Sequence, residues 1–165
     1  MNTRSYALPA LSALSIVTTA TGCSKVDPLV GDWIGNKMAQ TYLYADGTSY
    51  VYTYNLPQVT DSAEYTSTFG ITMALSEQYT GTLVMYNNYA YSNGTSSSEN
   101  YNYTLVGART ERGIWAISMT GTDMTLALTC TADQELDTVH CDSAPIMDAG
   151  DSMAYAFDFN RAVAE

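Results

Sequence analysis

His140 is the only histidine in the chain, and nearby carboxylates would suit a catalytic role for it. Asp137 or Asp142, together with one of many serines, would complete a Ser-His-Asp arrangement in which the histidine accepts the serine proton. The chain has no Gly-x-Ser-x-Gly segment, the strained turn that exposes a nucleophilic serine in many hydrolases. We therefore expect His140 to be a surface loop residue, and we expect no catalytic residues.

The acidic run Asp133-Gln134-Glu135-Leu136-Asp137 alternates like the start of a calcium-binding loop. An EF-hand is excluded because Thr138 occupies the position of the required glycine and Ala144 that of the closing glutamate. Asp148 and Asp151 are candidates for a looser calcium site, although a solvated acidic loop is the simpler interpretation. A single histidine also argues against zinc. The sequence therefore predicts neither a metal nor a cofactor.

Tyrosine is unusually abundant, with 14 residues, and five of them alternate with other residues in one short region. A tyrosine ring is apolar and carries a hydroxyl group, a combination that suits sugars, aromatic compounds and amphipathic lipids. The alternative is that these rings fill the interior of the fold or cover its outer wall. The candidate ligand-binding residues are Tyr42, Tyr44, Tyr50, Tyr52 and Tyr54.

The segment Ala45-Asp46-Gly47 predicts a tight hairpin between two of the strands. A two-residue loop would scatter the tyrosines over both faces. A three-residue loop with Gly47 in the left-handed conformation pairs Tyr42 with Tyr50 and places all five tyrosines on one face. A slip of one residue exchanges the faces of a strand, so we favour this more consistent register.

The remaining chain alternates with a period of two in short segments, most clearly at Met124 to Cys130 and Met153 to Arg161. Leu56 to Glu64 and the acidic stretch Ala132 to Asp151 are predicted to be irregular. Gly70 predicts a bend or bulge, and a change of parity predicts a bulge around Asn87-Asn88. A bend or break is also expected near Gly35-Asn36.

No segment has a sustained helical period, so the sequence predicts an all-β fold. Eight or nine short strands at regular spacing indicate an antiparallel barrel or a sandwich. We favour a single up-and-down β-barrel because closure removes exposed edges, and these strands carry few of the Lys and Pro residues that guard open edges.

Residues 1–22 are typical of a signal peptide, with Arg4 at the positive end and a modest apolar stretch from Tyr6 to Ala20. This stretch is too short and too polar for a membrane span. Ala20-Thr21-Gly22 followed by Cys23 resembles a bacterial lipoprotein signal, although the usual leucine three places before the cysteine is alanine here. Ordinary signal cleavage is the alternative. The resemblance implies an acyl anchor such as palmitate on Cys23.

The three cysteines support this interpretation, since an odd cysteine in an exported protein requires an explanation. Lipid on Cys23 would leave Cys130 and Cys141 to form a disulfide in an oxidising compartment. We expect residues 23–28 to be a lipid-anchored tether and residues 29–165 to be one barrel domain.

Gly31-Asp32-Trp33 resembles the Gly-x-Trp motif in the first strand of lipocalin-like proteins of the calycin group. In that group an arginine near the end of the last strand covers the tryptophan, and Arg161 is the candidate here. The resemblance implies a lipocalin-like barrel closed by a contact between Trp33 and Arg161. The alternative is an ordinary core tryptophan with a solvated arginine.

The formal charge is −11, and it becomes −12 once Arg4 is removed with the signal peptide. So few cations argue against nucleic acid as a partner, and against an anionic membrane bound through the protein surface. The sequence favours a non-enzymatic lipoprotein of the bacterial cell envelope, at the outer membrane, that binds a small hydrophobic or saccharide ligand. A structural or interaction domain of the envelope without a pocket and a secreted hydrolase are the alternatives. The oligomeric state and the identity of the ligand are left open.

Overall fold

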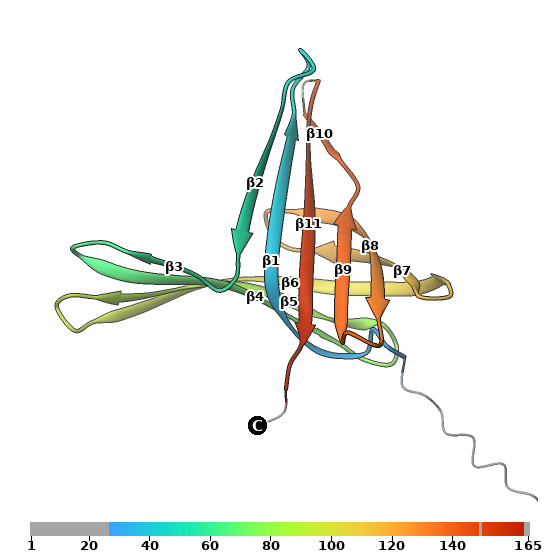
Figure 1. Ribbon diagram of the computed structural model, residues 1–165, viewed down its shortest axis with the longest axis horizontal. Coiled ribbons are helices and arrows are strands. Elements are labelled where there is room, and N and C mark those ends of the chain that lie inside the picture. The colour runs from blue at the N-terminus through green and yellow to red at the C-terminus, as the bar shows by residue number, and fades with distance from the viewer. Residues whose placement is uncertain (1–26, 149, 164–165) are drawn as a thin grey trace, which may run out of the picture.

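The computed structural model describes residues 27–148 and 150–163, and every regular element among them is a β-strand (Figure 1). Cys23 and the expected signal peptide lie outside the described residues. The strands are β1 (Gly31–Leu43), β2 (Ser49–Asn55), β3 (Gln58–Asp61), β4 (Tyr65–Leu75), β5 (Thr80–Tyr91), β6 (Ser96–Glu111), β7 (Ile114–Thr120), β8 (Thr125–Asp133), β9 (Thr138–Ser143), β10 (Ile146–Asp148) and β11 (Asp151–Arg161).

Eight strands close into an antiparallel barrel, and three further strands lie outside it. The barrel order is β1-β4-β5-β6-β7-β8-β9-β11, and β11 pairs with β1 to complete the ring. This confirms the predicted all-β, antiparallel up-and-down barrel. Near Gly35-Asn36, where a bend or break was expected, β1 continues unbroken and its ladder with β11 shifts register between Gly35 and Lys37.

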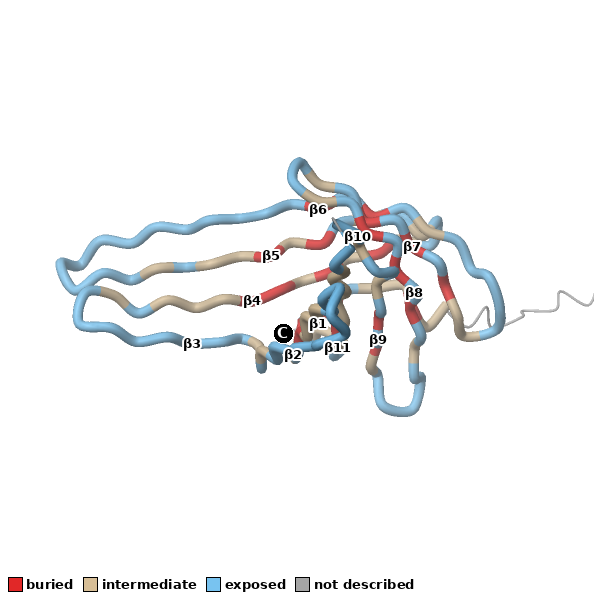
Figure 2. Tube along the Cα trace, turned by 90° about the horizontal axis from the view of Figure 1, so that it is seen from above, coloured by how far each residue is buried: buried red, intermediate tan, exposed pale blue. Residues whose placement is uncertain are grey.

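Several barrel strands continue beyond the ring and form two projecting arms (Figure 1). The upright arm consists of residues 39–55 and 146–156, which belong to β2, β10 and the adjoining parts of β1 and β11. The lateral arm consists of residues 58–69 and 87–102, which belong to β3, β4, β5 and β6. Figure 2 shows that the buried residues concentrate in the barrel and that the far part of the lateral arm is exposed.

The interior of the barrel is occupied by one cluster of apolar side chains that includes Trp33 and Trp115. Strict alternation produces this cluster, since every second residue of β7 and β8 is buried and the intervening residues are exposed. No buried side chain among the described residues is polar or charged. The barrel therefore holds a packed core rather than a ligand cavity lined by polar groups.

A cap of residues from Asp27 to Val30 closes the base of the barrel at Trp33. The Trp33 indole Nε1 donates a hydrogen bond of 3.0 Å to the carbonyl of Leu29, whose side chain is wholly buried. The guanidinium of Arg161 lies 4.3 Å from the centroid of the Trp33 ring, and the two residues are direct partners in the β1–β11 ladder. Arg161 also donates to the carbonyls of Val30 (3.1 Å) and Pro28 (3.0 Å).

Asp27 and Pro28, the last residues of the expected tether, therefore belong to this base. The carboxylate of Asp27 accepts a hydrogen bond of 2.7 Å from the hydroxyl of Tyr79 and lies 3.8 Å from the guanidinium of Arg109. Arg109 in turn lies over the ring of Trp115 at 5.6 Å. Each tryptophan of the core is thus covered by an arginine that contacts the cap.

Two segments predicted to be irregular form strands. β3 lies within Leu56 to Glu64, and β9 and β10 lie within Ala132 to Asp151. The first prediction was wrong because the polar residues of the exposed β3 give no apolar alternation, while β4 still satisfies its backbone hydrogen bonds. The second was wrong because the surrounding acidic residues obscured the short alternation of β9, in which Val139 and Cys141 are buried and His140 and Asp142 are exposed.

No bulge is present at Gly70 or at Asn87-Asn88, where the sequence allowed or predicted one. The ladder between β4 and β5 runs without a register shift through Gly70 and through Asn87-Asn88. At Gly70 the ring of Tyr86 occupies the space that a Cβ would need, so the glycine allows close aromatic packing. At Asn87-Asn88 the alternation of apolar residues in β5 changes phase because the strand leaves the core there; its last buried residue is Met85.

Replacing Arg161 with Lys should lower the free energy of unfolding by about 2 kcal/mol or more, because lysine lacks the planar fork that covers an indole and reaches two carbonyls. Urea denaturation of the variant beside the original chain measures this difference. Arg112→Lys is the control, since Arg112 is exposed and forms no ion pair with the described residues. Equal losses in the two variants would contradict the proposed role of the base contact.

Candidate functional site

The five candidate tyrosines lie on one face of the upright arm, as the three-residue loop predicts. The amide of Tyr44 donates to the carbonyl of Thr48 (2.9 Å), and Gly47 has a φ of 84°, the left-handed conformation that glycine accepts readily. Tyr42 is the direct partner of Tyr50, which confirms the predicted register. On this face β1 therefore contributes Tyr42, the residue just after β1 is Tyr44, and β2 contributes Tyr50, Tyr52 and Tyr54.

This tyrosine face lies beyond the barrel and does not line its interior. Met38 is the last buried residue of β1, and beyond it the strand enters the upright arm. Tyr50 and Tyr52 are 56% and 53% exposed. The tyrosines lie there because β1 and β11 continue past the mouth of the barrel.

Edge-to-face contacts hold the exposed rings in place. Tyr42 packs against Tyr52, and Tyr44 packs against Tyr50, in both cases with ring centroids 5.8 Å apart and planes close to perpendicular. Such pairs contribute roughly 0.5–1.5 kcal/mol beyond the burial of area. The contacts restrict the rings before any ligand arrives, which lowers the entropy cost of binding.

The last strand adds neighbours to this face that the sequence analysis did not assign to the site. The side-chain amide of Gln40 donates to the hydroxyl of Tyr155 (3.2 Å) and lies 2.9 Å from the sulfur of Met153. Partial burial raises the pKa of Tyr155, so its hydroxyl stays protonated and able to donate. The alternation of β11 is visible in the sequence, but its pairing with β1 appears only in the folded barrel.

A stack of rings joins the tyrosine face to the core. Tyr155 stacks on Phe157 with centroids 6.0 Å apart, and Phe157 stacks on Phe159 at 6.3 Å. Both phenylalanines are buried within the barrel. The inner face of the upright arm is therefore a direct continuation of the packed core.

A second group of tyrosines, which the sequence analysis missed, lies on the lateral arm. Tyr65, Tyr89 and Tyr91 contact one another with ring centroids 5.6–6.2 Å apart. The side-chain amide of Asn87 donates to the hydroxyl of Tyr89 (2.7 Å). Their signal in the sequence is weak because β4 and β5 contribute the rings from distant positions.

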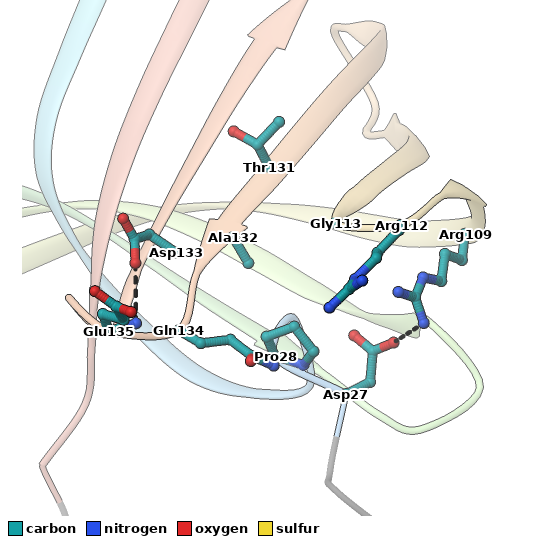
Figure 3. A pocket seen from close by; sticks show the side chains of 10 residues that line it. All are labelled: Asp27, Pro28, Arg109, Arg112, Gly113, Thr131, Ala132, Asp133, Gln134 and Glu135. Atoms are coloured by element: carbon teal, nitrogen blue, oxygen red, sulfur yellow. Dashed lines mark hydrogen bonds and ion pairs between the residues drawn. The ribbon is translucent and has the colours of Figure 1, made fainter.

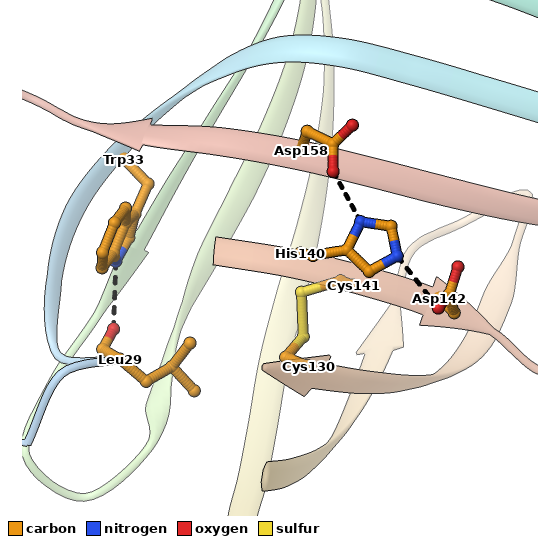
Figure 4. The surroundings of a disulfide bond; sticks show 7 residues. All are labelled: Leu29, Trp33, Cys130, His140, Cys141, Asp142 and Asp158. Carbon is orange, nitrogen blue, oxygen red and sulfur yellow. Dashed lines mark hydrogen bonds and ion pairs between the residues drawn. A yellow bond between two sulfur atoms is a disulfide. The ribbon is translucent and has the colours of Figure 1, made fainter. Parts of the chain in front are cut away.

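His140 lies on the outer wall of the barrel, in β9 and not in a loop (Figure 4). Its Nδ1 lies 2.5 Å from a carboxylate oxygen of Asp158, and its Nε2 lies 3.0 Å from one of Asp142. The hydrogen bond to Asp158 is the main reason that the pKa of His140 is raised above 6.5, while partial burial opposes the shift. Because carboxylates engage both ring nitrogens, neither is free to accept a serine proton.

The predicted disulfide between Cys130 and Cys141 is present (Figure 4). The two residues are direct partners in the ladder between β8 and β9, and both are wholly buried in the core. The disulfide therefore links the neighbouring barrel strands β8 and β9. It lies close to His140 but on the opposite face of the sheet.

A polar hollow of 820 Å³ lies at the base beside the cap (Figure 3). Arg109 and Arg112 contribute positive charge, and Asp27, Asp133 and Glu135 contribute negative charge. The Asp133 carboxylate accepts a hydrogen bond of 2.9 Å from the amide of Glu135, so it serves the local turn. Among residues 27–148 and 150–163, no group of acidic, histidine or cysteine side chains is arranged to hold a metal ion.

No protein-family model, curated protein or solved structure matches this chain. None of the described residues belongs to a helix long and apolar enough to cross a membrane. The function therefore has to be inferred from the geometry of the arms and the barrel.

Because the folded state raises the pKa of His140, protonation stabilises the fold. This stabilisation is fully present below pH 6.5 and is lost as the pH rises through the raised pKa. Titration of the His140 ring by NMR should give a pKa above 6.5, and Asp158→Asn should lower it further than Asp142→Asn does. A larger effect of Asp142→Asn would contradict the assignment of Asp158 as the main partner.

Proposed function

We propose that this protein is an exported, lipid-anchored protein of the bacterial cell envelope that binds a saccharide on the tyrosine face of its upright arm. The observation that carries the proposal is the row of exposed, mutually oriented tyrosine rings beyond the mouth of a filled barrel. The barrel would act as a rigid, lipocalin-like base, and the arm would contact the ligand.

The position of the tyrosines favours an extended ligand over a small hydrophobic one. A small apolar molecule requires a concave site that removes most of its surface from water. A glycan chain can instead lie along an open row of rings and exchange hydrogen bonds with hydroxyl and amide groups. Tyr50 and Tyr52 offer the rings, and Gln40 and Tyr155 offer polar groups beside them.

The proposed export and anchoring rest on the chain before the barrel and on the disulfide. Cys23 follows the small residues of the signal-like segment, and a buried disulfide suits an oxidising compartment. Asp27 is only four positions after Cys23, and its carboxylate accepts a hydrogen bond from the hydroxyl of Tyr79 at the base of the barrel. A lipid on Cys23 would therefore hold the base of the barrel near the membrane, at the outer membrane in our proposal.

We propose binding and not catalysis because the features of His140 suit a structural link. Its two ring nitrogens bridge Asp158 on β11 and Asp142 on β9, across the outer wall. Asp137, the other candidate for a catalytic triad, lies 3.1 Å from Arg161 at the base.

Protein recognition is a second candidate function, favoured by the lateral arm. Its tyrosines are accompanied by serine and asparagine, for example in the hydrogen bond between Ser98 and Asn88 (2.8 Å). Tyrosine, serine and asparagine together are typical of antibody surfaces that bind proteins, where rigid rings provide contact area and small polar groups adapt.

Replacing Cys23 with Ser should move the protein from the membrane fraction to the soluble fraction, because serine lacks the thiol to which the lipid would be attached. Phase partitioning in a detergent solution, followed by mass spectrometry of the N-terminal peptide, measures the anchor. Ser24→Ala is the matched control and should remain with the membrane. Equal partitioning of the Cys23→Ser variant and the original chain would contradict lipidation.

Replacing both Tyr50 and Tyr52 with Ala should weaken binding to a polysaccharide by about tenfold or more, because it removes the two most exposed rings that would contact the sugar. Sedimentation with purified peptidoglycan sacculi, whose glycan strands are long and repeating, measures the retained protein. Leu43→Ala is the control, because Leu43 is exposed on the opposite face of the same arm.

Loss of retention in the tyrosine variant but not in Leu43→Ala supports the proposal. Failure of the original chain to bind the sacculi, or equal retention of all three proteins, would contradict it. Capture of an envelope protein that depends on Tyr89 and Tyr91 instead would favour the second candidate function.

A further inference from the structure

The arms leave four strands with a free edge among the described residues, and these edges differ in how they are protected. β3 and β10 are short, with four and three residues, and each ends at an aspartate. The free part of β6, from Ser96 to Asn102, contains Glu99. Short length and charge are the usual means by which proteins prevent edge strands from pairing with other chains.

β2 has none of these protections. Its seven residues, Ser49-Tyr50-Val51-Tyr52-Thr53-Tyr54-Asn55, contain no charge, proline or glycine, and its ladder with β1 has no bulge. β2 forms the outer margin of the upright arm, with β1 on its only paired side (Figure 1). A long, uncharged edge of β-branched and aromatic residues is a template for another strand.

The ladder identifies which backbone groups of β2 face outward. Tyr44 and Thr48 form a hydrogen-bonded pair, and such pairs recur at every second position of an antiparallel ladder. Tyr50, Tyr52 and Tyr54 therefore direct their amide and carbonyl groups toward β1. Val51 and Thr53 direct theirs toward the free edge, where no described residue pairs with them.

We propose that the β2 edge binds the β2 edge of a second copy of this chain, giving a two-fold antiparallel dimer with one continuous sheet. A strand that pairs with itself about a two-fold axis needs no complementary charge, and Asp46 is the only charged residue between Lys37 and Asp61. The carboxylate of Asp46 is occupied by the amide and hydroxyl of Thr48 at the hairpin tip. In a chain of charge −11, the edge of this arm is a place where two copies can meet with little repulsion.

The dimer would place the tyrosine faces of both copies on the same side of the joined sheet, because antiparallel partners project their side chains to a common face. Pairing uses the backbone of Val51 and Thr53 and leaves the rings of Tyr50 and Tyr52 accessible. This inference does not depend on saccharide binding, since the edge and the face are separate surfaces of the arm.

The full chain in detergent solution should be dimeric by size-exclusion chromatography with light scattering. Val51→Pro removes an outward amide without removing a bond to β1, and Val51→Lys places like charges near each other across the two-fold axis. Both variants should raise the dimer dissociation constant about tenfold or more. Thr41→Lys is the matched control, because Thr41 is the partner of Val51 on the same face but lies one strand further from the edge.

Hydrogen exchange provides a second measurement that does not depend on a variant. In the original chain, the amides of Val51 and Thr53 should be protected from exchange. In Val51→Lys, the amide of Thr53 should exchange rapidly. The amide of Tyr52 faces β1 and should stay protected in both proteins. A monomeric original chain, or a dimer that Thr41→Lys weakens as strongly as Val51→Lys does, would overturn the proposal.

Discussion

The contact between Trp33 and Arg161 joins the first barrel strand to the last, and the rest of the structure depends on it. The two ends of a long chain must meet for the ring to close, at a cost in chain entropy. Two contributions at the base offset that cost. Trp33 is buried, and the guanidinium of Arg161 donates hydrogen bonds to the carbonyls of Pro28 and Val30. The ladder between β1 and β11 runs from this contact past the barrel mouth, so the closing contact and the tyrosine face lie at opposite ends of the same pair of strands.

The arms are stabilised differently from the barrel. A small sheet in water needs an apolar face, or packing against another element, to be stable by itself. Here each arm contains continuations of barrel strands, and in the upright arm the rings of β11 stack from Phe159 through Phe157 to Tyr155. Tyrosine suits such a ribbon because its ring contributes packing while its hydroxyl tolerates water. The same property leaves the rings available to a ligand, so stability of the arm and recognition use the same side chains.

The sequence predicts the barrel and the hairpin because both depend on local signals. Alternation in β7, β8 and β11 marks the core, and Gly47 determines the loop that sets the register of the tyrosines. The arms could not be predicted, since a strand with two solvated faces, such as β3, lacks apolar alternation. For the same reason a tyrosine row looks identical inside a barrel and beyond it. Only strand length relative to the barrel wall, a property of the whole sheet, separates the two positions.

The face and the edge of the upright arm point in perpendicular directions, so a ligand and a second copy of the chain can bind at the same time. Rings of Tyr50 and Tyr52 project from the face, whereas the free amide and carbonyl groups of Val51 and Thr53 lie in the plane of the sheet. Pairing of two edges therefore extends the face instead of covering it. Two linked faces on a repeating polymer bind more tightly than one, because the second contact occurs at a high effective concentration. An exposed edge strand usually favours aggregation, but because β2 carries no charge its edge can instead pair two copies and double a weak binding surface.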